Sequence, residues 1–147
     1  MDMLRLRFEP EDEWHGKLTA TVSAAGFAGQ GNAWFNTDEL RRFVATVSAF
    51  PLKEDDLPSI AGGFGGEAEA LDQIHLAIDV APHSPRGIIR VTTRLATEVW
   101  NTEIVDLASN VTVRFLVTYG DLGIFGTALL ELIEGRSADA TLQSSVD

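Results

Sequence analysis

Polar and apolar residues alternate along three segments in the second half of the chain, 73–82, 87–97 and 110–118. This period of two is typical of strands with one buried face and one polar face. The polar positions that could do chemistry are His75, Asp79, Arg90, Arg94 and Arg114. Because arginine presents a planar fork of N–H donors, this face could contact a protein partner or an anionic ligand. The alternative is a solvated face with cross-strand pairs, such as Asp79 with Arg90 or Arg94, each worth about 0.2–1 kcal/mol.

Two tryptophans in polar surroundings are further candidates for partner contact. Trp14 follows the acidic run at 11–13, and Trp100 lies in a second polar stretch. Exposed tryptophans often anchor interfaces, although either side chain could equally fill a local gap. Trp34, next to Phe35, is predicted to belong to the core.

The sequence contains no pattern typical of a metal site or a catalytic centre. The absence of cysteine excludes disulfides, thiolate nucleophiles and cysteine-based zinc sites. His75 and Asp79 share a strand face, but four residues of strand separate them by about 13 Å. No Gly-x-Ser-x-Gly elbow is present. We therefore expect no enzymatic activity, no cofactor and no metal.

Glycines 26, 29 and 31 resemble a nucleotide-binding loop only superficially. Their spacing is G-x-x-G-x-G and a strand-like segment follows, whereas the dinucleotide fingerprint opens a helix. This stretch predicts a hairpin turn.

The charge balance limits the choice of partner. The chain has 11 Lys and Arg against 22 Asp and Glu, a net charge of −11. Nucleic acids and anionic membrane surfaces both require clustered positive charge, so neither is an expected partner. The acidity favours solubility or a basic protein partner. With no apolar run of membrane-spanning length, we predict a cytoplasmic protein.

The strand-like segments and two helical segments predict the fold. The first helix is expected over 36–50, where Asn36 and Glu39 form a capping box, and the second ends before Gly135. We predict a single α+β domain over residues 1–147, with a largely antiparallel sheet of about six to eight strands and two helices packed on one face. Residues 62–66 should form a glycine-rich loop, and residues 144–147 should fray.

The two helical segments share one apolar pattern. Leu40-x-x-Phe43-x-x-x-Val47 matches Leu122-x-x-Phe125-x-x-x-Leu129, and a strand-like segment precedes each. An internal duplication of a strand–helix unit would explain the match. Convergence explains it equally and is our preferred interpretation, since two helices that cover one sheet need the same stripe.

Four short motifs resemble those of the WapI-type immunity-protein-like family of small, poorly characterised bacterial proteins. They are Trp34-Phe35, Asp38-x-Leu40-x-x-Phe43, Gly87-x-x-Arg90-Val91 and Phe115…Tyr119-x-x-Leu122-x-x-Phe125. The resemblance spans most of the chain and implies a non-enzymatic protein that neutralises a toxin by binding it. The matching residues are structural, so the resemblance assigns no functional residue.

The expected function is therefore a soluble, acidic, non-catalytic protein-binding domain of immunity-like type. An exposed strand edge, or the arginine-bearing face, would also allow a homodimer. The alternative is a small-molecule-binding protein or an enzyme that uses a cleft between the glycine-rich loop and the sheet.

Overall fold

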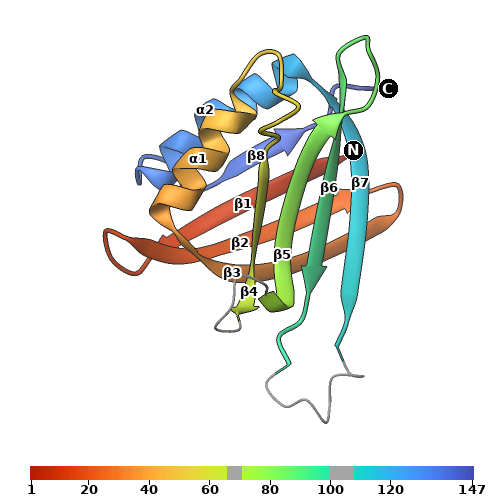
Figure 1. Cartoon of the computed structure of the whole chain (residues 1–147). Helices are drawn as coiled ribbons and strands as arrows, with labels where there is room; N and C mark the ends of the chain where they lie inside the picture. Colours follow the sequence, from red (N-terminus) through yellow and green to blue (C-terminus); the bar gives the residue numbers. More distant parts are fainter. Residues whose placement is uncertain (66–70, 100–107) are drawn as a thin grey trace.

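The computed structural model describes residues 1–65, 71–99 and 108–147 (Figure 1). In these ranges the chain forms two four-stranded antiparallel sheets and two helices. Sheet A contains β3 (Phe27–Asn36), β2 (His15–Ala24), β1 (Met3–Pro10) and β8 (Ala140–Gln143), in that order. Sheet B contains β4 (Ser59–Gly65), β5 (Leu71–Pro82), β6 (Ile88–Ala96) and β7 (Asn110–Thr118). The helices are α1 (Thr37–Val47) and α2 (Tyr119–Ile133).

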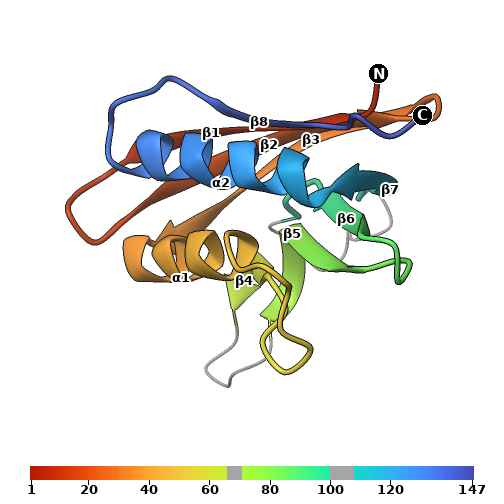
Figure 2. The same ribbon diagram turned by 90° about the horizontal axis from the view of Figure 1, so that it is seen from above.

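The α+β prediction, with six to eight strands and two helices, is confirmed. The strands form two sheets, however, and not the single sheet that we expected. Figure 2 shows α2 lying along sheet A and α1 on the other side of α2, next to β4. The apolar stripes of the helices therefore meet each other as well as the sheets, and one core lies between all these layers.

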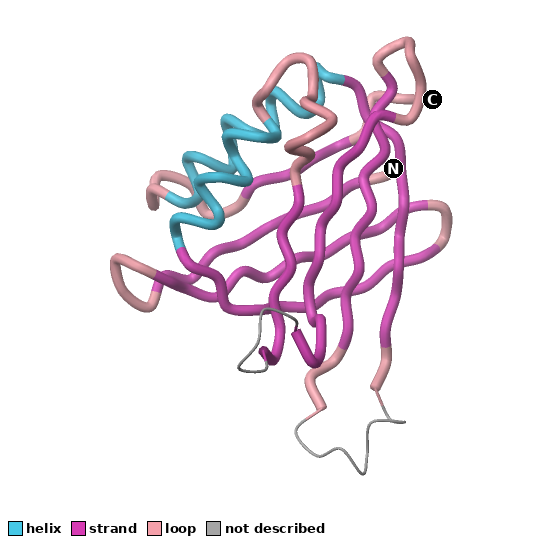
Figure 3. The backbone as a smooth tube through the Cα atoms, in the orientation of Figure 1, coloured by secondary structure: helices cyan, strands magenta, loops and turns pink. Residues whose placement is uncertain are grey.

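Strand β3 crosses the inner face of sheet B at close range and touches all four of its strands (Figure 3). The approach is possible because Gly29 and Gly31 have no side chain. A Cβ at Gly29 would lie 2.5 Å from Cγ1 of Val111, and one at Gly31 would lie 2.9 Å from the carbonyl oxygen of His75. Both glycines belong to β3 rather than to a turn, so the hairpin turn is limited to residues 25–26.

The glycine-rich segment is a strand, which corrects the expectation of a loop over 62–66. Residues 62–65 lie in β4 and pair with β5, whereas Gly66 lies outside the described residues. A Cβ at Gly62 would lie 2.8 Å from the ring of Phe35. Main-chain pairing and this close packing offset the entropy cost of ordering glycines, which had favoured a loop.

Ser144 and Ser145 are anchored by hydrogen bonds, which corrects the expectation of fraying over 144–147 for these two residues. The N–H of Ser144 donates to the carbonyl oxygen of Asp2 at 3.0 Å. The N–H and hydroxyl of Ser145 both donate to Oδ2 of Asp121, each at 3.0 Å. The segment after β8 thus joins the first strand to the start of α2.

The two halves of the chain have the same topology. Each half runs through three antiparallel strands, a helix and a fourth strand: β1-β2-β3-α1-β4, then β5-β6-β7-α2-β8. In both halves the fourth strand leaves its own three and pairs with the first strand of the other half, β4 with β5 and β8 with β1. The sequence showed a likeness between two strand–helix segments. The structure extends this likeness to the order and pairing of the elements in the two halves.

Candidate functional site

Three arginines form one exposed surface on the outer face of sheet B. Arg90 and Arg94 lie on β6 and Arg114 on β7, and all three are exposed. The register places Arg114 opposite Thr92, so that Arg114 is diagonal to both arginines of β6. Diagonal neighbours in an antiparallel pair lie about 7–8 Å apart, within reach of long side chains. We call these three residues the arginine surface.

The arginine surface is only partly neutralised. Nη2 of Arg94 lies 3.9 Å from Oδ2 of Asp79, and the other oxygen of this carboxylate accepts a hydrogen bond from the hydroxyl of Ser59 at 2.7 Å. Within the described ranges, neither Arg90 nor Arg114 forms an ion pair. The expected pair of Asp79 with Arg94 is thus present as a long contact, and two guanidinium groups remain available to a ligand.

His75 was predicted to share this exposed face, and that prediction is wrong because its side chain is only 2% exposed. Its Nε2 lies 2.8 Å from Oε1 of Gln73, and its ring packs edge-on against Phe64 with centroids 4.5 Å apart. The cause is a register shift: Gly62 pairs with Leu76 but Gly63 pairs with Ile74. His75 is the extra residue of this bulge, which interrupts the strict alternation on which the prediction relied.

The tryptophans lie apart from the arginine surface. Trp14 is 69% exposed in the acidic turn between β1 and β2, at the end of sheet A. Trp100 lies outside the described residues. Trp34 is 53% exposed, so its predicted place in the core is wrong. Since Ala33 and Phe35 point inward, the alternation along β3 turns Trp34 outward, and this was the signal in the sequence that could have placed it.

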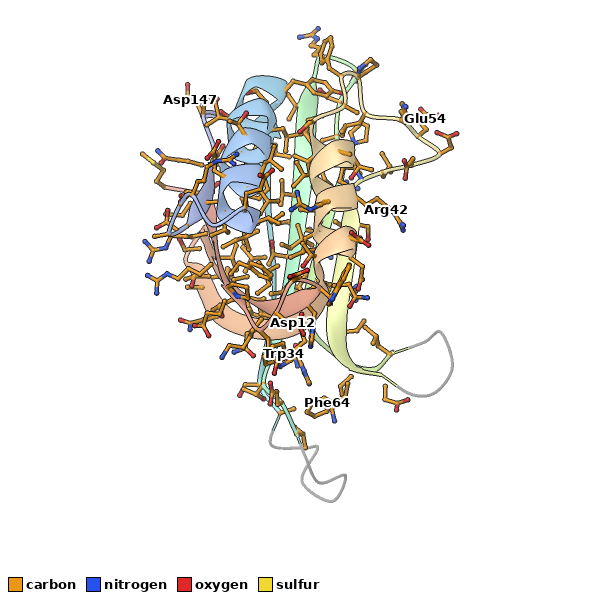
Figure 4. The ribbon with its side chains drawn as sticks, turned by 90° about the vertical axis from the view of Figure 1, so that its left-hand side faces the viewer. Asp12, Trp34, Arg42, Glu54, Phe64 and Asp147 are labelled. Atoms are coloured by element: carbon orange, nitrogen blue, oxygen red, sulfur yellow. The ribbon has the colours of Figure 1, made fainter. Side chains whose placement is uncertain are left out.

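A hollow that the sequence did not predict lies beside Trp34. It has a volume of about 520 Å³ and is lined by Lys17, Gln30, Gly31, Asn32 and Trp34 of sheet A and by Ala96, Thr97 and Glu98 at the end of β6. A smaller hollow of about 170 Å³ continues along Ala28 and Gly29 towards Ser109 and Val111. We call the two together the β3 hollow. Figure 4 shows Trp34 near the turn that carries Asp12, in agreement with the 6.2 Å between the ring centroids of His15 and Trp34.

In the part of the chain that the structure describes, no three His, Asp or Glu side chains converge as they would around a metal ion. In the same part, no helix has the length and apolar character needed to cross a membrane. The arginine surface and the β3 hollow are two features that could bind a ligand, and a smaller hollow of about 160 Å³ lies between α1 and β4.

Comparison of the chain with models of protein families, with curated proteins and with solved structures gave no significant match. The resemblance to the WapI-type immunity family therefore stays a prediction, and the arginine surface and the β3 hollow are the features that bear on function.

Proposed function

We propose that this protein is a non-catalytic protein-binding domain that uses the arginine surface to bind an acidic patch on its partner. The observation that carries the proposal is the grouping of Arg90, Arg94 and Arg114 on one exposed sheet face of a chain with net charge −11. Arginine is the side chain best suited to paired hydrogen bonds with carboxylates, and it is enriched among the residues that dominate binding energy.

The alternative of a solvated face with cross-strand pairs accounts for one of the three arginines in the described ranges. Asp79 is the one carboxylate that reaches the arginine surface in the described ranges, and its distance of 3.9 Å from Arg94 is at the limit of an ion pair. An exposed pair of this kind contributes about 0–1 kcal/mol, so a partner could replace Asp79 at little cost.

Toxin neutralisation is the particular form of this function that the family resemblance implies. In that case the partner is a toxin, and the arginine surface covers acidic groups that the toxin needs. The alternative function required a cleft beside residues 62–66. Because residues 62–65 pair with β5 and Phe35 fills the space beside Gly62, we prefer a protein partner.

The test is affinity capture from a cell lysate with three immobilised proteins: the wild type, Arg90→Ala/Arg94→Ala and Arg41→Ala/Arg42→Ala. The last is a matched control, since it removes two exposed arginines from α1. We expect a protein that the wild type and the control retain and that the Arg90/Arg94 variant loses. Calorimetry with the purified partner should then show affinity that falls as salt rises. Retention of the same partner by a folded Arg90→Ala/Arg94→Ala variant would contradict the proposal.

A further inference from the structure

Strand β3 is an edge strand without the usual protection against pairing with another chain. Natural proteins protect sheet edges with short strands, bulges, proline or charged residues. The other three edges have such a feature: β8 has four residues, β4 has two register shifts, and β7 carries Arg114. By contrast, β3 has ten residues and contains neither proline nor a charged side chain.

The turn at residues 25–26 determines which main-chain groups of β3 face the open edge. Both turn residues have positive φ, 54° and 87°, as in a two-residue hairpin turn whose flanking residues, here Ala24 and Phe27, are hydrogen-bonded to each other. Hydrogen-bonded and non-bonded pairs then alternate along the strands. The bond from the N–H of Thr37 to the carbonyl oxygen of Trp14, at 2.7 Å, agrees with this alternation. The residues whose N–H and C=O point away from β2 are Ala28, Gln30, Asn32 and Trp34.

These four residues are among those that line the β3 hollow. In the described part of the chain, no hydrogen bond is made by the outward main-chain groups or by the side-chain amides of Gln30 and Asn32. The seven residues from Ala28 to Trp34 span about 20 Å, since each of the six steps along the strand is about 3.3 Å. The hollow therefore runs along a row of free donors and acceptors long enough for a short extended segment.

The far side of the hollow is formed by β6 and β7, which continue past β3 (Figure 1). Their ladder extends to Thr97 and Ser109, where the N–H of Thr97 donates to the carbonyl oxygen of Ser109 at 2.9 Å. We call the part of β6 and β7 beyond β3 the overhang. It gives the hollow a floor of Ala96, Thr97 and Ser109, whereas Leu95 lies beneath Gly31 and is only 2% exposed. A strand added to β3 would lie on this floor and place alternate side chains beside Trp34.

The overhang also excludes a second copy of this chain from the edge. Antiparallel pairing of two β3 edges requires a two-fold axis perpendicular to sheet A. In such a dimer the two overhangs would lie on the same side of the joined sheet. The overhang of each copy would then occupy the space that sheet B of the other copy fills. A single extended segment fits because one strand needs only about 4.8 Å in the direction of hydrogen bonding.

We propose that the free edge of β3 binds an extended peptide segment of a partner protein as a fifth strand of sheet A. The main-chain groups of Gln30 and Asn32 bind the peptide backbone, and Trp34 packs against an apolar or aromatic side chain of the peptide. Lys17 and Glu98 have opposite charges, so the favoured peptide carries no large net charge. This site is separate from the arginine surface and does not depend on it.

The probe is a phage-displayed library of linear heptapeptides, selected on the wild-type protein. Asn32→Pro removes an N–H that faces the open edge without breaking a bond to β2. Thr112→Pro is the matched control, because Thr112 has the same outward register on the open edge of β7. Trp34→Ala tests the aromatic contact in a variant that keeps the main chain.

We expect selected peptides to bind the wild type and Thr112→Pro with similar affinity, and to lose at least tenfold on Asn32→Pro and on Trp34→Ala. Hydrogen exchange of the wild type should slow at the amides of Gln30, Asn32 and Trp34 when peptide is bound. This measurement needs no folded proline variant.

Each of four results would overturn the proposal. Selection could enrich no peptide over background. Selected peptides could bind Asn32→Pro and Thr112→Pro with equal affinity. Bound peptide could leave the hydrogen exchange of the amides of Gln30, Asn32 and Trp34 unchanged. A dimer in light scattering that Asn32→Pro dissociates would instead assign the edge to a second copy. Arg90→Ala/Arg94→Ala should leave peptide binding intact, so the failure of one site is distinguishable from the failure of the other.

Discussion

Glycine at position 31 lets β3 lie against sheet B without a side chain between them. A Cβ there would lie 2.9 Å from the carbonyl oxygen of His75 and 3.2 Å from Cβ of Leu95. Neither of these groups is the flexible end of a long side chain, so the strands themselves would have to move. The crossing of the two sheets, and the floor of the β3 hollow, depend on this position.

We predict that Gly31→Ala destabilises the protein by about 1–3 kcal/mol, the usual cost of extra volume in a packed core. Gly123→Ala is the control: no atom lies within 4 Å of its added Cβ, and alanine favours helix over glycine by about 1 kcal/mol. Gly123→Ala should therefore stabilise the protein. Urea unfolding at equilibrium measures both changes, and equal stability of Gly31→Ala and the wild type would refute the close approach.

Single residues also set the limits of prediction from sequence. Alternation placed Arg90, Arg94 and Arg114 on an exposed face, because each strand there is regular. It fails at His75, where a bulge interrupts the period, and at Trp34 it gives the outward direction that residue type, which favours the core, does not. Local pattern predicts a side chain's direction only while the pairing register stays unbroken.

At the scale of elements, α2 begins with a reciprocal pair of hydrogen bonds. The N–H of Thr118 donates to Oδ2 of Asp121 at 2.9 Å, and the N–H of Asp121 donates to Oγ1 of Thr118 at 3.1 Å. Ser145 adds two more donors to the same carboxylate. Although partial burial opposes ionisation, the hydrogen bonds from Thr118 and Ser145 lower the pKa of Asp121 below its ordinary value of 3.8. This carboxylate therefore joins β7, α2 and the chain end.

We predict that Asp121→Asn lowers the free energy of unfolding by about 1 kcal/mol at neutral pH, a typical value for a lost helix cap. A carboxyl whose pKa is lower in the folded state stabilises the protein above its unfolded pKa, and this stabilisation is lost as pH falls through the folded pKa. The difference between wild type and variant should thus shrink below about pH 4. Denaturant unfolding between pH 2.5 and 7 measures it. Asp139→Asn, whose side chain makes no hydrogen bond in the described ranges, is the control, and a constant difference across this range would contradict the role of Asp121.

At the scale of the whole molecule, positive charge gathers on the outer faces of the sheets. Six of the eleven Lys and Arg residues lie there: Arg5, Arg7, Lys17, Arg90, Arg94 and Arg114. Many carboxylates lie instead in the turns and at the helix starts, for example at 11–13, 38–39 and 54–56. A net charge of −11 therefore coexists with locally basic sheet faces, so the net charge alone does not determine which sign of charge a partner surface must carry.

The exchange of fourth strands makes the two halves depend on each other. Without β8, sheet A ends at β1, and without β4, sheet B ends at β5. We predict that fragments 1–66 and 67–147 are each largely unfolded alone and form a folded 1:1 complex when they are mixed. Circular dichroism and light scattering measure this, with the intact chain as the reference. A fragment that folds alone as a monomer would show that its core does not need the exchanged strand.

The sequence by itself determined the helices, most of the strands and the polar face of β6 and β7. These features depend on periodicity over a few residues, which neighbouring positions encode. The division into two sheets, the exchange of β4 and β8, the strand formed by the glycine-rich segment and the β3 hollow were decided by the tertiary structure. Each of these depends on contacts between residues far apart in the chain, such as Gly31 with Leu95 and Gly62 with Phe35. Their energies arise only when the layers pack together, so no local pattern could reveal them.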